Sequence, residues 1–275
     1  MTPLGGPPRA PQETSIVTAE ASVNTGRFLV FEDRPSDSPL VERIWRSHSE
    51  RAGTFLSVAS SHCEMVVTRH RGTTFLTLRG PETRAAPVDC PADGEWLGIR
   101  LSLGTFLPFH PAAALSDRRD VHLTGATGRS FRLHGLAWEY PDFENAETLV
   151  TRLFQAGVLA RDPAVGAALS GEWHALSRRS IQRHFLRATG ITHVAYRQIQ
   201  RARYATTLLE RGVSILDTVH QAGYFDQAHL TRSLRRLIGE TPARLRERAT
   251  QLSFLYKTGQ VGESTLARLQ QPSSP

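Results

Sequence analysis

The sequence predicts an α+β protein, in which an antiparallel β domain resembling a barrel or roll precedes an all-α domain of two helix-turn-helix units joined by a linker helix. Three observations lead to this prediction. Short runs rich in Val, Phe, Thr and Leu fill the chain before residue 140, apolar residues recur at helical spacing after it, and one helical motif occurs twice. We divide the chain into a disordered segment 1–25, a β-rich domain 26–160, a tandem helical domain 161–250 and a tail 251–275.

The β domain is predicted from five segments separated by Gly, Pro, Asp and Ser clusters, which are RFLVF, TFLSVA, EMVVTRH, TTFLTLRG and EWLGIRLSL. Each segment alternates or runs apolar, a pattern typical of antiparallel strands. A helix is expected to follow at residues 144–158, where an apolar stripe consists of Leu149, Val150, Leu153 and Phe154. For this stripe we favour packing between the domains over a dimer contact, because an amphipathic helix needs only one surface to cover it.

The motif in the helical region repeats at an offset of 49 residues. Its first copy contains Arg183, Arg187, Gly190, Thr192 and Arg197, and its second contains Arg232, Arg236, Gly239, Thr241 and Arg246. An apolar pair recurs with it, first as Ile181 and Phe185 and then as Leu230 and Leu234. Each copy begins after a residue suited to cap a helix, Ser177 or Asp226, and ends at a glycine suited to the left-handed C-cap. Two short helices are therefore expected.

A shorter helix and a glycine-containing turn precede each copy. The helices are expected at residues 163–171 and 214–222, and the turns at Gly171 and Gly223. Between the units, residues 194–211 carry one apolar side made of Tyr196, Ile199, Ala202, Ala205, Leu208 and Leu209. A helix of this length spans about 27 Å. Because successive major grooves on one face of DNA lie roughly 34 Å apart, such a strut could hold two helices in adjacent grooves.

The polar faces of the two repeated helices suit the edges of DNA bases. They carry Arg178, Arg179, Gln182 and Arg183 in the first copy and Gln227, His229 and Arg232 in the second. Arginine donates two hydrogen bonds to guanine O6 and N7, and glutamine pairs in the same way with adenine N6 and N7. A solvated polar face is the plainer interpretation of a charge run, but two copies in the same register favour base reading.

Basic charge is concentrated in the helical region. Residues 151–250 contain 16 arginines, no lysine and 7 acidic residues, a net charge of +9. The whole chain carries +7, so the remainder sums to −2. Because each neutralised phosphate releases condensed counterions, an excess of this size predicts salt-dependent binding to a polyanion.

Two stretches resemble the DNA-binding domain of the AraC/XylS family of bacterial transcriptional regulators. They are ALSRRSIQRHFLRATG and RARYATTLLERGVSILDTVHQAGYFDQAHLTRSLRRLIGETPARLR, and the resemblance covers about residues 163–248. It implies base contacts from Arg179, Gln182, Arg183, Gln227, Ala228, His229 and Arg232. It implies phosphate contacts from Arg178, Arg187 and Arg236. The resemblance also implies that the β-rich domain is a sensor that binds a small effector or mediates self-association.

Candidate effector contacts lie in the β domain but form no motif. They are Trp45, His62, Trp96, Arg100, Phe109 and His110, and each could equally be ordinary core or surface. Metal-ligand residue types occur at His62, Cys63, His70 and Cys90, but their spacing matches no standard zinc pattern. We therefore expect no metal and no cofactor.

Three classes of function were weighed. A sequence-specific transcription regulator agrees with the repeat, the charge and the resemblance. A metal-dependent β-barrel enzyme targeted to DNA lacks a triplet of nucleophile, base and orienting residue, and an alkyl-repair protein would need a cysteine cluster. A nonspecific architectural DNA-binding protein is the third class, and competition with mismatched sites separates it from the first. We expect a regulator that is not an enzyme.

Composition sets the expected location and partners. The chain has 275 residues, 40% hydrophobic content and two cysteines, with no apolar signal segment and no apolar run of 18 residues. These features predict a cytoplasmic, nucleoid-associated protein without membrane contact. Double-stranded DNA is the expected partner, and a small-molecule effector, RNA polymerase and a second copy of the chain remain open.

Overall fold

The computed structural model describes residues 28–117, 120–123, 125–170 and 177–247. The strands are β1 (Leu29–Pro35), β2 (Val41–Ser49), β3 (Gly53–Ser57), β4 (Glu64–His70), β5 (Thr73–Arg79), β6 (Ala86–Cys90), β7 (Glu95–Leu101), β8 (Thr105–Phe106), β9 (Val121–Leu123), β10 (Gly125–Thr127), β11 (Ser130–Leu133), β12 (Leu136–Glu139) and β13 (Ala160–Arg161). The helices are η1 (Ala112–Leu115), α1 (Ala146–Gln155), α2 (Pro163–Ser170), α3 (Arg178–Thr189), α4 (His193–Glu210), α5 (Ile215–Gln221), α6 (Gln227–Leu237) and α7 (Pro242–Glu247). The expected N-terminal disorder, the turn at Gly171 and the C-terminal tail lie outside the described residues.

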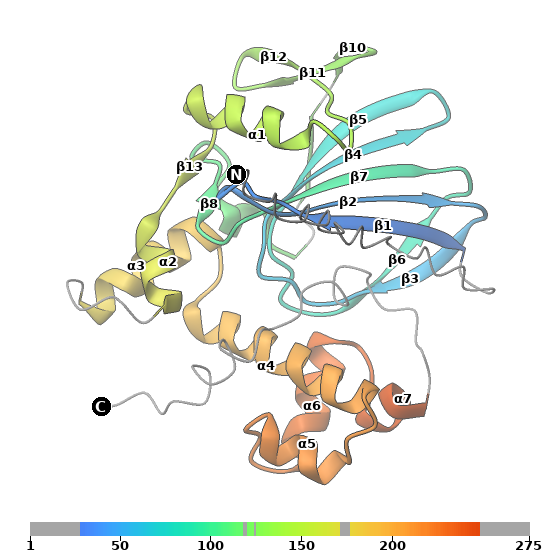
Figure 1. The fold of residues 1–275 in the computed structure, drawn as a ribbon, viewed down its shortest axis with the longest axis vertical. Coiled ribbons are helices and arrows are strands. Elements are labelled where there is room, and N and C mark those ends of the chain that lie inside the picture. Colours follow the sequence, from blue (N-terminus) through green and yellow to red (C-terminus); the bar gives the residue numbers. More distant parts are fainter. Residues whose placement is uncertain (1–27, 118–119, 124, 171–176, 248–275) are drawn as a thin grey trace, which may run out of the picture.

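The N-terminal domain is built on a six-stranded antiparallel sheet in the order β1-β2-β7-β4-β5-β9. Because side chains alternate across a strand, this sheet has two distinct faces. Ile44, Met65, Leu76 and Ile99 belong to the apolar face, which packs against α1 and β11–β12 in one core cluster. The other face bears Trp45, Thr68, Thr77 and Trp96, which line a cavity together with residues of the smaller β3–β6 sheet. Strands β3 and β6 lie below β1 and β2 in the view of Figure 1.

All five predicted β segments coincide with strands, which are β1, β3, β4, β5 and β7. Strands β2 and β6 were not predicted, because charged residues interrupt the apolar pattern of β2 and β6 contains Pro87. The described strands form separate sheets. In the six-stranded sheet, β1 and β9 are the two outer strands and do not pair with each other. A closed barrel is therefore not established.

Helix α1 covers the sheet of its own domain. Leu149, Val150 and Leu153 are buried and belong to the core cluster that contains the apolar face of the six-stranded sheet. The predicted packing between domains is therefore wrong for this stripe, since its covering surface is the sheet that precedes it in the chain. Phe154, expected in the stripe, is 41% exposed.

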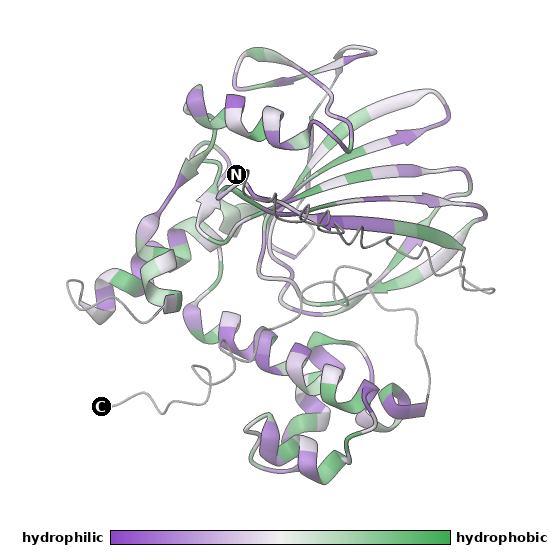
Figure 2. Ribbon diagram, in the orientation of Figure 1, coloured by the Kyte–Doolittle hydropathy of each residue, from purple (hydrophilic) through white to green (hydrophobic). Residues whose placement is uncertain are grey.

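The C-terminal helices follow the predicted order. Helix α4 coincides with the helix expected at residues 194–211, with bounds shifted by one residue. All six residues of its predicted apolar side are buried. Hydrophilic and hydrophobic residues alternate along α4 and α6 (Figure 2). Helix α4 contacts α5, α6 and α7, while α2 packs on α3. Among the described residues, no helix is both long enough and apolar enough to cross a membrane.

The β domain and the helices share a core and backbone hydrogen bonds. Val58 and Ala59 belong to the same buried cluster as the apolar residues of α3, α4 and α6. The last carbonyl groups of a helix lack intrahelical partners. In α6, the carbonyls of Arg236 and Leu237 accept hydrogen bonds of 2.8 Å from the backbone amides of Ala85 and Ala59, respectively. The loops of the β domain therefore cap α6 at its C-terminal end.

Candidate nucleic-acid interface

Helices α3 and α6 are built alike at both ends and along both faces. The Ser177 hydroxyl accepts from the amide of Ser180 at 3.2 Å, and the Asp226 carboxylate accepts from the amide of His229 at 2.6 Å. Gly190 and Gly239 follow the two helices with φ of 75° and 84°. These contacts confirm the predicted N-caps and the left-handed glycines.

The apolar pairs of the two helices are buried, as predicted. Ile181 is 7% exposed, whereas Phe185, Leu230 and Leu234 are fully buried. Burying these residues anchors each helix and leaves its opposite face to solvent.

Most of the predicted base-contacting side chains are exposed. On α3 these are Arg179, Gln182 and Arg183, and on α6 they are Gln227, Ala228 and Arg232. His229 differs, because it is half-buried and its ring meets the Tyr224 ring edge-on, with 5.1 Å between the centroids. The side chain of Arg178 lies outside the described residues. The structure thus presents exposed arginine and glutamine side chains on two separate helices, with Arg183 and Arg232 at equivalent positions.

The predicted phosphate contact Arg187 already has a protein partner. Its Nη2 atom lies 2.8 Å from the Asp162 carboxylate, and its guanidinium lies over the Phe106 ring at 5.7 Å from the centroid. His184 Nδ1 lies 2.8 Å from the same carboxylate oxygen. Burial alone would raise the pKa of Asp162, but these two hydrogen bonds hold it below its ordinary value. The sequence pattern could not reveal this contact, because Asp162 precedes the repeat.

The third predicted phosphate contact, Arg236, has an exposed side chain, while its carbonyl is held by Ala85 as described above. One large apolar residue that was not singled out also lies at this surface. Phe225 directly precedes the N-cap of α6 and is 90% exposed. The sequence feature that could have revealed Phe225 was its position next to the N-cap of α6, and not a periodic apolar pattern.

Comparison with known proteins identifies this region. Residues 174–248 match the family model described as a helix-turn-helix domain. Residues 174–248 are thus a helix-turn-helix domain of the AraC type, the AraC-type domain. Over 109 residues it is 33% identical to the HTH-type transcriptional regulator RipA of Corynebacterium glutamicum. That match covers 39% of this chain and 30% of RipA, so the shared part is less than a third of the relative's length. No solved structure matches the chain.

Four of the candidate effector contacts line a single cavity next to the AraC-type domain. The cavity lies between the six-stranded sheet and β3–β6, has a volume of about 340 Å³, and is lined in part by Trp45, His62, Trp96 and Arg100. Five aromatic rings border it, from Phe31, Trp45, Phe55, Phe75 and Trp96. Helix α4 of the AraC-type domain contributes Arg203 to the same lining.

The two remaining candidates lie elsewhere. His110 is absent from the cavity lining, and its backbone instead forms an isolated bridge with Leu107. Phe109 is 56% exposed and stacks on the His134 ring at a centroid distance of 3.8 Å. Phe109 and His110 therefore do not line this cavity, and their assignment to an effector pocket stays a prediction.

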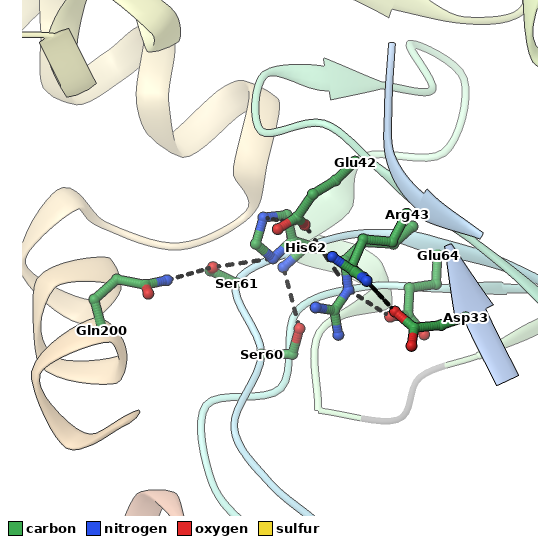
Figure 3. Close-up of polar contacts among 9 residues, drawn as sticks. Asp33, Glu42, Arg43, Ser60, Ser61, His62, Glu64 and Gln200 are labelled. Carbon is green, nitrogen blue, oxygen red and sulfur yellow. Dashed lines mark hydrogen bonds and ion pairs between the residues drawn. The ribbon is translucent and has the colours of Figure 1, made fainter. Parts of the chain in front are cut away.

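A buried polar chain links α4 to the β domain beside this cavity. Gln200 Nε2 donates to the Ser61 hydroxyl at 3.4 Å, and that hydroxyl lies 3.3 Å from His62 Nδ1 (Figure 3). His62 Nε2 lies 3.0 Å from the Glu42 carboxylate. Arg100 Nε donates to Glu64 at 3.0 Å and lies 4.0 Å from Glu42. Gln200, Ser61 and His62 thus connect α4 of the AraC-type domain to the Glu42 carboxylate of the β domain.

The buried histidine makes stability depend on pH. Burial lowers the pKa of His62 to about 4, against the opposing attraction of Glu42 and with help from Arg100 and Arg203. The unfolded chain takes up this proton near pH 6.5 and the folded chain does not, so stability is complete above pH 6.5 and falls as the pH drops toward 4. From pH 7 to pH 4.5 we expect a loss of about 2 kcal/mol in the free energy of unfolding.

Urea unfolding at both pH values measures this loss, with His62→Gln as the comparison. In the variant, the free energy of unfolding should depend less on pH, because the contribution of His62 is removed. His193, whose pKa is also lowered by burial, contributes a remaining slope of the same sign. Glu42, whose pKa lies below its ordinary value, adds a loss of the same sign near the lower pH, where the unfolded chain begins to protonate this carboxyl group. An unchanged slope in the variant would show that His62 is protonated alike in both states.

Proposed function

We propose that this protein is a sequence-specific DNA-binding transcription regulator that uses α3 and α6 as two recognition helices. The observation that carries the proposal is the pair of helices with equivalent exposed side chains, Arg183 on α3 and Arg232 on α6, at the two ends of α4. Helix α4 has 18 residues and a length of about 27 Å. This length supports placement of the two helices in adjacent major grooves of one duplex.

The regulator is proposed to act by binding rather than by catalysis, under control of the β domain. A small effector bound in that domain, or self-association through it, would supply the control. Similarity to RipA, a transcriptional regulator, supports a role in the regulation of transcription. We also propose RNA polymerase as a partner of the regulator.

Selection from randomised duplex oligonucleotides at moderate ionic strength tests the proposal. The full chain should enrich a site with two half-sites about one helical turn apart. Each altered base pair in a contacted half-site should then weaken binding by about 1–3 kcal/mol. Equal binding to selected and scrambled duplexes would favour a nonspecific architectural protein, and the absence of binding to either would overturn the proposal.

A further inference from the structure

Among the residues that the structure describes, Phe225 is the large apolar residue with the greatest exposure, at 90%. It directly precedes Asp226, the N-cap of α6. An apolar residue at this position often packs on the fourth residue of the helix and so fixes the direction in which the chain enters it. In α6 the fourth residue is Leu230, which is fully buried, and a ring that is 90% exposed does not cover it. Packing within the protein therefore does not account for this aromatic ring.

The chain on both sides of Phe225 is held in place. Tyr224, the residue before it, is buried. From α4, Arg201 donates to the Gly223 carbonyl at 3.3 Å, and its guanidinium lies over the Tyr224 ring at 4.6 Å from the centroid. Asp226, the residue after it, is fixed by its capping bond to α6. Because both neighbours are anchored, the ring of Phe225 stays in solvent unless a partner covers it.

Phe225 lies at one end of the face of α6 that is proposed to read bases. Ala228 and Arg232 are both exposed and four residues apart, so they lie on one side of the helix, and Phe225 lies three residues before Ala228. At about 1.5 Å per residue, roughly 10 Å along the helix axis separates Phe225 from Arg232. This length corresponds to about three base pairs at about 3.4 Å each. In a groove that holds α6, the ring would therefore meet a base near the one that Arg232 contacts.

The chemistry of the ring favours one base. In the major groove the base edges present hydrogen-bond donors and acceptors, and thymine also presents an apolar C5-methyl group. A phenylalanine ring has no group that can pair with a donor or acceptor, so covering one of these leaves it unsatisfied and costs free energy. Covering a methyl group is favourable, because both apolar surfaces leave water. Thymine is therefore the base that the ring of Phe225 would select.

We propose that Phe225 is a specificity-determining residue that reads the methyl group of a thymine, within about three base pairs of the base contacted by Arg232. This inference rests on the proposed function and adds to it one residue and the base that this residue selects. Because the neighbouring chain is already fixed, the ring gives up only the freedom of its two side-chain torsions when it binds. The selected duplex should carry a thymine at this place in the half-site bound by α6.

Replacement of single thymines by deoxyuridine in the selected duplex tests the proposal, because deoxyuridine lacks only the methyl group. Each thymine of both half-sites is replaced in turn, and the dissociation constant of the full chain is measured by fluorescence anisotropy. At the thymine read by Phe225, loss of the methyl group should weaken binding about 3- to 5-fold. Phe225→Ala should weaken binding to the thymine duplex by at least the same factor. At that position it should bind the thymine and deoxyuridine duplexes equally.

Two further variants and a stability measurement complete the experiment. Phe225→Leu keeps an apolar side chain and should retain most of the difference between the two duplexes. Phe154→Ala is the matched control, since it removes a phenylalanine ring that is 41% exposed on α1 of the β domain, and it should show the full difference. Because Phe225 packs on so little of the protein, Phe225→Ala should unfold at the same urea concentration as the unchanged chain. A loss of affinity is then not a loss of fold.

The outcomes that contradict the proposal differ from one another. A selected half-site without a thymine near the base contacted by Arg232 would overturn it. A deoxyuridine effect that persists in Phe225→Ala would assign the methyl contact to another side chain, such as that of Ala228. Weaker binding by Phe225→Ala with no deoxyuridine effect in the unchanged protein would place the ring on the sugar-phosphate backbone. Failure of the proposed function has a separate signature, since the chain would then enrich no duplex at all, and this inference would fail with it.

Discussion

Replacing Gly190 with alanine is expected to lower the free energy of unfolding by about 3 kcal/mol. Gly190 ends α3 with φ of 75°, a conformation that costs an L-residue about 1–2 kcal/mol. A Cβ at this position would also lie 2.5 Å from the backbone carbon of Ala112 and 2.6 Å from the amide nitrogen of Ala113 in η1. Because both neighbours are backbone atoms, the clash requires α3 to move away from the β domain. Urea unfolding followed by circular dichroism measures the loss.

Gly157→Ala separates the two causes. Gly157 has φ of 71°, but nothing lies within 4 Å of a Cβ built there. This variant should therefore lose only the conformational part, about 1 kcal/mol. Equal losses for both variants would mean that α3 and η1 accommodate the added methyl group without strain, and that α3 is not held tightly against the β domain.

Replacing Arg232 with alanine should weaken binding to the selected duplex by about 1–3 kcal/mol, or roughly 5- to 150-fold. The Arg232 side chain is exposed on α6, and in the proposed complex its guanidinium donates two hydrogen bonds to a guanine, both of which alanine removes. Preference for that base should be relaxed in the same half-site. Arg183→Ala should have the corresponding effect in the other half-site, since Arg183 occupies the equivalent position on α3. Titrations against duplexes altered one base pair at a time measure both effects.

Two further variants control for charge. Arg129→Ala removes an exposed arginine from the β domain and should leave the base preference unchanged. Arg232→Lys keeps the charge but loses the planar fork, so it should retain salt-dependent affinity and lose discrimination. If Arg232→Ala weakens binding equally on every duplex, Arg232 contacts phosphate and not a base.

The helical part of the fold could be predicted well from the sequence, because its signals are local. Capping residues, left-handed glycines and apolar pairs four residues apart each act within one turn, as at Ser177, Gly190 and Leu234. The β domain was predicted less completely. Strand β2 contains Glu42, Arg43 and Arg46, and its membership of the sheet depends on partners distant in the chain.

The predictions for the functional site divide in the same way, into features set by local sequence and features set by contacts with distant residues. Exposure of Arg183 and Arg232 follows from the position of the buried stripe on each helix. The pairing of Arg187 with Asp162 and the half-burial of His229 do not, since both depend on contacts with residues outside the repeat. In the β domain, Trp45 and Arg100 lie on one face of two adjacent strands, but that adjacency is set by the strand order and not by either segment alone.

The backbone bonds from Ala59 and Ala85 to the end of α6 bear on how this protein could be recombined with a related regulator. A chimera joined at residue 161 would combine the β domain of another protein with this α6. The carbonyl groups of Arg236 and Leu237 would then face loops of a different sequence. Grafts that carry residues 55–60 and 82–86 along with the helices should preserve the native docking angle. The part of the chain that can be exchanged between regulators therefore consists of separate segments of the sequence.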